Sequence, residues 1–496
     1  MVAELQVDRL EDTCSWCCQK AITDPTERAM AQNMGVPAAF LELKTCTGCK
    51  KVRYCSKTCQ SKDWKMEHKY ECKFLSARPT LPPGVRAVYK LLKRLEKGDE
   101  AVKDMLTFQD KREDARKMNA QTYNDLSEMA WGTWKYAGEP PCASQDVATH
   151  LFFTIISSTI GLASAVDDAR LGFGWDPLLC SVNHSCEPNA FYLFNQPRTI
   201  LRASQRIAKG EEIFIRYCDV HNPSKVRQAE LRKSYFFECG CKKCMKGATL
   251  AADQFQRPVD KLDARWASKA DKLLERKDLD LEKYAVGKNT SQGERRVAAL
   301  QAKAFQVMKT SGVKYGQDDT DGPDEDELKA ALEMCLQSEM WSLTRQPVPD
   351  ILDQLFSLYF HTQRLEQALH IGLVRHFVVD PALGVEVFAN RMLDTFALAQ
   401  VAGSFSGHES KQKEQQLKKD GCDLQMLYLD LLWICWDGLE KSYGQDSAFG
   451  QVVSRKWQMA TGGIPSLPEE AKTKLRDARG PLKSYAQKID VLRWVR

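Results

Sequence analysis

The sequence predicts an α+β chain in which a short β-rich section lies between a cysteine-rich N-terminal region and a long helical C-terminal region. Closely spaced cysteine and histidine pairs occupy residues 14–72, and short β-prone runs separated by Pro and Gly turns occupy residues 176–217. Apolar residues at helical spacing dominate beyond residue 248. With 496 residues and a hydrophobic fraction of 43%, the chain is long enough for two or three domains.

The N-terminal region carries four ligand pairs. They are Cys14-x2-Cys17, Cys46-x2-Cys49, Cys55-x3-Cys59 and His68-x3-Cys72. Structural zinc takes four sulfur or imidazole ligands in a tetrahedron, so eight ligands suffice for two ions. Trp64, His68 and Cys72 recur every four residues and would share one face of a helix. The spacing therefore predicts two zinc ions, although buried apolar cysteines or disulfides are the alternatives.

A second cluster needs a ligand from elsewhere. Cys239, Cys241 and Cys244 supply three thiolates, and Cys186, about fifty residues earlier in the heptapeptide NHSCEPN, is the best available fourth. Eleven of the 18 cysteines are then assigned to zinc, and the odd remainder argues against a disulfide scaffold. We therefore expect three structural zinc ions.

Charge and hydropathy narrow the classes of partner. The formal net charge is +5. Eleven thiolates would subtract eleven charges and three Zn²⁺ would add six, which leaves a net charge of zero, so the charge of the whole chain predicts no polyanion partner. The finger region itself is rich in lysine, which fits either a nucleic-acid or acidic-peptide surface or a solvated face that balances the thiolates. No apolar run reaches the roughly 18 residues that span a bilayer, and no leader pattern precedes Cys14. We expect no membrane contact and a reducing compartment, nucleus and/or cytoplasm.

Periodicity and turn residues predict the remaining elements. Helices are expected at 85–97, at 100–118 and at 149–166, and strands at 190–194, 199–203 and 212–217. Further helices are expected at 264–281, 293–310, 327–343, 351–363, 364–377, 385–401 and 422–443. The acidic run 318–327 is interpreted as a solvated linker and the polar run 404–420 as a mobile loop.

The string Y-C-S-x2-C-Q-x3-W-x3-H-x3-C from Tyr54 to Cys72 resembles the MYND zinc finger. In that family the ligand pairs interleave. The resemblance implies Cys14, Cys17, Cys55 and Cys59 on one ion and Cys46, Cys49, His68 and Cys72 on the other, with Cys18 as the alternative to Cys17.

N-H-S-C-x-P-N at 183–189, followed by G-E-E-I-x-I-x-Y at 210–217, resembles the SET domain of protein lysine methyltransferases. Together with the finger, the chain is similar to the SET and MYND family. The resemblance implies an α+β fold: a SET-type small β-sheet core with an inserted MYND zinc finger and a post-SET zinc site, followed by an all-α, TPR-like C-terminal domain. The implied divisions are residues 1–13 (remnant of the SET N-terminal part), 14–72 (finger), 73–175 (helical linker and SET insert), 176–220 (SET core), 221–247 (post-SET zinc region) and 248–496 (helical domain).

The resemblance implies an S-adenosylmethionine-dependent protein-lysine N-methyltransferase that acts on a histone or another protein. Tyr217 is then the catalytic tyrosine and Tyr235 a second channel tyrosine, while Asn183, His184, Ser158 and Tyr217 contact the cofactor. A free lysine has a pKa near 10.4, so the site must favour the neutral amine, which an apolar channel does. The expected partners are a lysine-containing protein substrate and peptides bound by the finger, and a monomer is expected.

The sequence departs from the family pattern in its long insertion between Cys17 and Cys46 and at two places that concern the cofactor site. The family carries a glycine-rich G-x-G turn ahead of its finger, and residues 1–13 contain none, while residues 172–174 have that spelling but are interpreted as a loop. Ser157 and Ser158 stand near the position of a cofactor-binding asparagine. Two other functions stay open: a catalytically silent scaffold that binds partners through the finger and the helical domain, and a zinc-dependent DNA-binding regulator.

Overall fold

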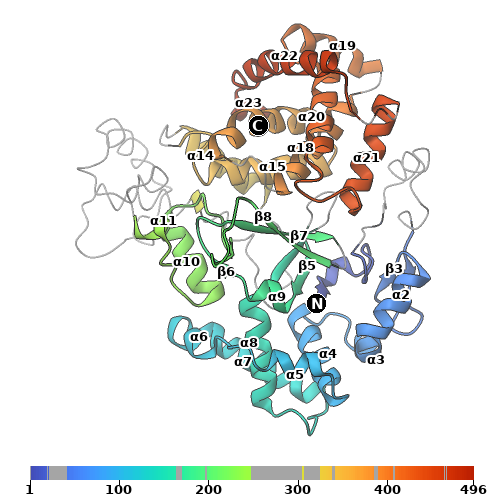
Figure 1. Cartoon of the computed structure of the whole chain (residues 1–496), viewed down its shortest axis with the longest axis vertical. Coiled ribbons are helices and arrows are strands. Elements are labelled where there is room, and N and C mark those ends of the chain that lie inside the picture. The colour runs from blue at the N-terminus through green and yellow to red at the C-terminus, as the bar shows by residue number, and fades with distance from the viewer. Residues whose placement is uncertain are drawn as a thin grey trace. The chain divides into compact units, whose positions relative to one another are not determined.

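The computed structural model describes residues 2–18, 21, 42–163, 170–195, 198–246, 304–305, 324–337, 341–384, 389–405, 408–462, 464 and 466–495. The chain forms two compact units, coloured from blue to red along the sequence in Figure 1. The first contains residues 1–218 and 227–241, and the second contains residues 219–226 and most of the chain from 242 onward.

The described residues of the first unit form four small sheets, three of which lie outside the finger. Strand β5 (Arg170–Trp175) pairs antiparallel with both β1 (Val2–Leu5) and β4 (Ile160–Ala163). Strands β7 (Ala190–Asn195) and β8 (Arg198–Ala203) form an antiparallel pair, and the short β6 (Asn183–His184) runs parallel to β9 (Phe214–Ile215). The expected strands at 190–194 and 199–203 are confirmed, whereas the one expected at 212–217 is reduced to β9.

The segment interpreted as a loop at 172–174 is instead the centre of β5, so that interpretation was wrong. Gly172 has φ +156°, and a Cβ atom there would lie 1.9 Å from the carbonyl oxygen of Glu4 in β1. Only glycine allows the two strands to approach so closely. This glycine therefore serves strand pairing.

Helices α4 (Pro83–Glu96), α7 (Ala120–Tyr136) and α8 (Gln145–Ser158) build the apolar core beside these sheets. The helix expected at 85–97 is α4. The stretch 100–118 divides into α5 (Glu100–Met105) and α6 (Arg112–Met118), and α7 was not predicted. The helix expected at 149–166 ends at Ser158, because the next residues join the sheet as β4.

The finger consists of two short strands and one long helical run. Strands β2 (Lys44–Thr45) and β3 (Arg53–Tyr54) pair antiparallel. Helix α2 (Lys57–Asp63) continues through the π-helical turn η3 (Trp64–His68) into α3 (Lys69–Ala77). Ser56 caps α2, since its hydroxyl accepts the backbone N–H of Cys59. The helical run thereby carries three of the predicted ligands.

The described part of the second unit is helical. Its elements are α14 (Glu325–Gln337), α15 (Val348–His361), α16 (Leu365–Val374), η9 (Arg375–Val379), α17 (Asp380–Leu383), α18 (Ala389–Gly403), α19 (His408–Lys419), α20 (Leu424–Gly438), α21 (Ala448–Thr461), α22 (Glu469–Ala486) and α23 (Val491–Val495). Leu355, Leu369, Leu398 and Leu431 lie in one fully enclosed apolar core. Among the described helices, none has the length and apolar composition needed to cross a bilayer.

Most helices expected here are confirmed, and one interpretation is wrong. Helices α14, α15, α16, α18 and α20 lie where helices were expected, and α16 continues into η9. The supposed mobile loop at 404–420 is largely helix α19, because its Lys, Glu and Gln residues have high helix propensity. The expected helix at 264–281, most of that at 293–310 and most of the linker at 318–327 lie outside the described residues. Helices α21, α22 and α23 were not predicted.

Candidate functional site

The first set of finger ligands comes from two segments that β3 brings together. Cys14 forms an isolated β-bridge with Arg53 in β3, which places the first cysteine pair against the pair at the start of α2. Cys14, Cys17, Cys55 and Cys59 all have their sulfur atoms within 4.8 Å of one another. The sulfur of Cys55 lies 3.5 Å from that of Cys17 and 3.4 Å from that of Cys59. Cys18 is buried and is not a member of this set.

The second set joins the β2–β3 turn to the helical run. Cys46, Cys49, His68 and Cys72 are grouped within 4.8 Å. The Nε2 atom of His68 lies 3.4 Å from the sulfur of Cys46 and 3.6 Å from that of Cys49. Gly48 is required between them, because a Cβ atom there would lie 2.8 Å from the sulfur of Cys72. The Trp64 ring packs edge-on against His68 at 5.9 Å, as the four-residue spacing predicted.

Both sets fit zinc by distance and by chemistry. Tetrahedral zinc with sulfur bonds of about 2.3 Å holds sulfur atoms about 3.8 Å apart, and the observed separations of 3.4–4.0 Å lie close to that value. They are far longer than the roughly 2.05 Å of a disulfide. Four converging thiols, or three thiols and one imidazole, are also the donor types that structural zinc sites use. The finger is a zinc-binding unit.

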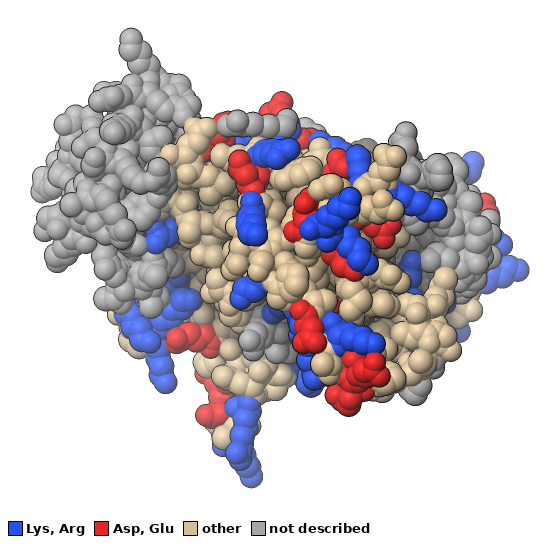
Figure 2. Space-filling model, turned by 90° about the horizontal axis from the view of Figure 1, so that it is seen from above, with Lys and Arg blue, Asp and Glu red and all other residues tan. Residues whose placement is uncertain are grey.

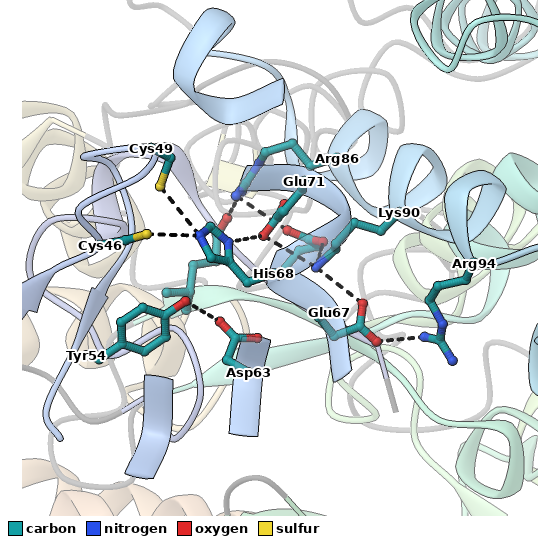
Figure 3. Close-up of polar contacts among 12 residues, drawn as sticks. Cys46, Cys49, Tyr54, Asp63, Glu67, His68, Glu71, Arg86, Lys90 and Arg94 are labelled. Carbon is teal, nitrogen blue, oxygen red and sulfur yellow. Dashed lines mark hydrogen bonds and ion pairs between the residues drawn. The ribbon is translucent and has the colours of Figure 1, made fainter. Parts of the chain in front are cut away.

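A largely buried ionic cluster, comprising Glu4, Glu67, Glu71, Arg86, Lys90 and the half-buried Arg94, ties His68 to the rest of the first unit. Figure 3 labels its members other than Glu4. The Nδ1 atom of His68 lies 3.3 Å from a carboxylate oxygen of Glu71. Lys90 of α4 reaches Glu71 at 3.9 Å, Glu67 at 3.6 Å and Glu4 of β1 at 2.5 Å. Burial raises the pKa of Glu4 to about 7, against the opposing effect of Lys90. The finger and β1 thus meet through charged groups.

Charge is mixed on the face shown in Figure 2. Lysine and arginine alternate with aspartate and glutamate over a largely uncharged surface, and the described residues on this face form no extended patch of one sign. A nucleic-acid surface gains no support from it.

The third set joins Cys186, which lies just after β6, to three cysteines in the segment that follows α10 (Ser224–Tyr235). The sulfur atoms of Cys186, Cys239, Cys241 and Cys244 lie within 4.8 Å of one another, as the sequence predicted. The side-chain amide of Gln228 in α10 pairs with the backbone of Cys239: its Nε2 donates to the carbonyl oxygen at 2.8 Å and its Oε1 accepts the N–H at 2.9 Å. This clamp orients the first cysteine of the tail.

A small cavity of about 50 Å³ lies in the first unit beside β9. Its walls are Ser158, Thr159, Ile160, Gly161, Leu179, Cys180, Tyr192, Ile215, Arg216, Tyr217 and Tyr235. Both tyrosines assigned to the methyl-transfer channel are therefore present in one wall, with ring centroids 4.7 Å apart. Phe237 packs edge-on to Tyr217 at 6.3 Å and does not line the cavity.

Both tyrosine hydroxyls donate their proton inside the fold. The Tyr217 hydroxyl donates to the carbonyl oxygen of Val182 at 2.6 Å, and the Tyr235 hydroxyl donates to the carbonyl oxygen of Tyr217 at 3.3 Å. Burial, together with the nearby Cys180, raises the pKa of Tyr217 to about 12, so the phenol stays neutral. The hydroxyl oxygens can still accept hydrogen bonds through their lone pairs.

The residues assigned to the cofactor have different surroundings. Ser158 lines the cavity, but its hydroxyl accepts the Trp175 Nε1–H at 2.9 Å and donates to the carbonyl of Thr154. The Asn183 amide is exposed and donates to Glu212 at 2.8 Å. The His184 ring packs against the Tyr217 ring, with the ring centroids 5.3 Å apart. Burial is the larger cause and the charge of Arg227 the smaller cause that together lower the pKa of His184 to about 4. Asn183 and His184 do not line the cavity.

Sequence reasoning missed most of the cavity wall. Ile160 and Gly161 belong to β4, which was expected to be helix, and Cys180 ends the short helix α9 (Pro177–Cys180). The Cys180 thiol donates to the carbonyl oxygen of Ser158 at 2.7 Å. Ile215 and Arg216 directly precede Tyr217 within the matched G-E-E-I-x-I-x-Y string, which was the one available signal.

Comparison with known proteins gives a consistent result. The family model of the MYND finger matches residues 35–72. The chain is 33% identical over 211 residues to histone-lysine N-methyltransferase SMYD3 of Mus musculus, covering 41% of this chain and 49% of that protein. It is 29% identical over 246 residues to SET domain and MYND-type zinc finger protein 6 of Schizosaccharomyces pombe (49% and 45%), and 29% identical over 258 residues to N-lysine methyltransferase SMYD2-B of Danio rerio (49% and 55%). The matched regions span about half the length of these relatives.

The finger and its two ligand sets define a MYND-type zinc-binding protein. The matches extend well beyond residues 35–72, and two of these three relatives are named lysine methyltransferases. The chain is therefore similar to SET and MYND domain proteins over about half of their length.

Proposed function

We propose that this chain is an S-adenosylmethionine-dependent protein-lysine N-methyltransferase whose substrate is a histone or another protein. The observation that carries the proposal is the pair of tyrosines in the cavity wall. Tyr217 and Tyr235 both give their hydroxyl protons to backbone carbonyls, so they present only lone pairs to a bound group. A wall of acceptors suits a lysine amine, which has N–H donors.

The other walls favour the neutral, reactive form of that amine. Ile160, Leu179 and Ile215 are apolar and exclude water, and a low-dielectric site disfavours the ammonium form. Tyr217, neutral with its raised pKa, orients the amine as an acceptor and takes no proton from it. The nitrogen lone pair would then be free to bond to the methyl carbon as the bond from that carbon to sulfur breaks, with the neutral thioether as leaving group and the extra amine proton passing to water.

S-adenosylmethionine, when bound, supplies an electrophilic methyl group on a positively charged sulfur. The tyrosine oxygens suit such a charge because they carry partial negative charge without being ionised. Ser158 shapes the wall, since its hydroxyl is already used by Trp175 and Thr154. Asn183 and His184 are proposed to contact the cofactor through the backbone of β6.

The zinc ions have a structural part in this proposal. We propose three of them, one for each set of four ligands, holding the finger and the segment after α10 in place. The finger is proposed to bind partner peptides, the substrate is a lysine-containing segment, and the compartment is the nucleus, the cytoplasm or both. The helical second unit is proposed to select partners or substrates.

The decisive experiment is calorimetric titration of the zinc-loaded chain with S-adenosylmethionine, followed by a tritiated methyl-transfer assay on mixed histones and a lysate. Micromolar one-to-one binding with lysine labelling is the expected result. Absence of binding, with three zinc ions measured per chain, would overturn the proposal and leave the scaffold function.

Tyr217→Phe tests the assigned role of the hydroxyl. Removing it should lower turnover on the order of a hundredfold while changing cofactor affinity little, because the interaction acts mainly on the reacting amine. Tyr136→Phe is the matched control, since Tyr136 is exposed on α7 and does not line the cavity. An equal loss of cofactor affinity and turnover would contradict the role.

A further inference from the structure

Both ring nitrogens of His184 are used inside the protein. The Nδ1 atom lies 2.9 Å from the backbone nitrogen of Tyr217 and accepts its N–H. A nitrogen that accepts carries no proton, so the proton of the neutral ring lies on Nε2. That atom is 3.3 Å from the sulfur of Cys186, toward which it donates. One imidazole therefore connects a predicted zinc ligand with the backbone of the catalytic tyrosine.

The local strand pairing shows why this contact matters. In the parallel pair β6–β9, His184 stands opposite Ile215, and the N–H of Ser185 donates to the carbonyl of Ile215 at 3.1 Å. Strand β9 ends at Ile215, two residues before Tyr217. The described strand hydrogen bonds stop there, and the His184 side chain supplies the next one.

We propose that His184 is a positioning residue that links the zinc ion of the Cys186 set to Tyr217. A zinc-bound thiolate has no proton and can only accept, so it holds the ring proton on Nε2 and leaves Nδ1 free to accept the N–H of Tyr217. The aromatic rings of Tyr217 and Phe237, at 5.3 Å and 6.0 Å, keep the imidazole in this orientation. The importance of Tyr217 rests on the proposed methyltransferase function, while the link itself does not.

The alternative role for His184 is that of a metal ligand. His184, Cys186 and Cys218 also lie within 4.8 Å of one another and could together hold a metal ion. The four-sulfur set around Cys186 is already complete for tetrahedral zinc, which leaves no position for a nitrogen ligand. A ligand role and a positioning role differ in the number of zinc ions that remain after substitution.

Two conservative variants separate the two hydrogen bonds. In His184→Asn the shorter amide can approach the Nδ1 position and keep the Tyr217 contact, whereas in His184→Gln the longer amide can approach Nε2 and keep the Cys186 contact. His184→Ala removes both. His221→Asn is the matched control, because His221 is half-buried and hydrogen-bonds to Asp219.

The first readouts are zinc content by native mass spectrometry and the rate of zinc transfer to a colorimetric chelator. We expect all three variants to retain three ions, with His184→Asn and His184→Ala losing one of them roughly tenfold faster, as outer-sphere partners of zinc typically allow. His184→Gln should lose it at nearly the native rate. Loss of one whole ion in every variant would mean that His184 is a ligand, which overturns the proposal.

The second readout is hydrogen exchange at the Tyr217 amide, measured by fragmentation mass spectrometry on the peptide that contains it. We expect exchange roughly tenfold faster in His184→Ala and in His184→Gln, in line with the loss of one hydrogen bond. Cys244→Ser, which removes a distant ligand of the same zinc, should also speed exchange, and adding His184→Ala to it should change little more. Fully additive effects, or unchanged exchange in His184→Ala, would overturn the link.

These readouts need no turnover. If the chain binds no S-adenosylmethionine but the exchange results follow expectation, the methyltransferase proposal fails and the zinc–tyrosine link stands. If activity is found, His184→Gln should lower kcat more than it raises KM, because the backbone of Tyr217 is displaced while the cavity remains.

Discussion

The second zinc set of the finger and the set around Cys186 are both four-ligand sites, but they are supported in opposite ways. In the finger, His68 is one of the four grouped side chains, and its Nδ1 atom faces Glu71, which belongs to a buried cluster of charged residues. Around Cys186, the Nε2 atom of His184 faces the sulfur of Cys186, while its Nδ1 atom accepts the backbone N–H of Tyr217. The finger's support extends into α4 and β1, while the other set's support extends into the cavity wall. Loss of the zinc ion at the finger set should therefore disturb the finger, α4 and β1, whereas loss of the ion at the Cys186 set should disturb the cavity wall.

The largest expected effect is the loss of a whole ion. Cys49→Ser should remove one zinc ion and unfold the finger, because a structural zinc contributes on the order of 10 kcal/mol to folding. Cys244→Ser should remove one ion and leave the finger folded. Native mass spectrometry and hydrogen exchange over residues 44–77, compared with α20, measure both outcomes. Equal exposure of residues 44–77 in the two variants would abolish the distinction.

The next effect concerns the buried charges behind the finger. Lys90→Met leaves Glu4, Glu67 and Glu71 without their shared cation and should cost about 3–5 kcal/mol of unfolding free energy, the usual cost of breaking a buried ion pair. Lys103→Met is the control, since its pair with Glu100 is exposed and such pairs contribute less than about 1 kcal/mol. Denaturant unfolding of the two variants should differ accordingly, and similar curves would mean that the cluster is not ionised as described.

A smaller effect on stability is expected from the pairing of β1 with β5. Gly172→Ala forces a Cβ atom against the carbonyl oxygen of Glu4 and should cost about 1–3 kcal/mol, as overpacking does. Gly132→Ala in α7 meets open space and should stabilise the chain by about 0.5–1 kcal/mol. Thermal unfolding of the pair measures the difference. A Gly172→Ala protein as stable as the parent would show that β1 and β5 can separate freely.

The sequence could predict the zinc ligands but only part of the cavity, for a physical reason. Metal coordination restricts both residue type and spacing, so Cys46 to Cys72 carry their signal within one short segment. Strands β1 and β5 are separated by about 170 residues, and nothing near Gly172 shows that Glu4 lies opposite it. Ile160 and Cys180 line the cavity without chemical restriction of their own, so no local pattern distinguishes them from core residues.

Prediction of secondary structure from the sequence failed where hydrophobic composition and residue propensity pointed to different structures. Helix α19 has few apolar residues, and its polarity indicated a loop, yet Lys, Glu and Gln all favour helix. The run 149–166 is mostly apolar and indicated one helix, but the β-branched Ile160 begins strand β4 and pairs with Gly174 of β5. In both cases the deciding information lay outside hydrophobic periodicity.

The smallest expected effect concerns the hydrogen bond between Glu71 and His68. Glu71→Gln keeps an oxygen that can accept from His68 but removes the negative charge that strengthens this hydrogen bond, so zinc should leave the finger up to about tenfold faster. Glu96→Gln, at the end of α4 and largely exposed, is the control. Because Glu71 and the cavity wall share no described hydrogen bond, exchange at the Tyr217 amide should stay at the native rate in Glu71→Gln, in contrast to His184→Ala. If Glu71→Gln also exposed that amide, the two zinc regions would act as one network, and their separate supports would have no separate consequences.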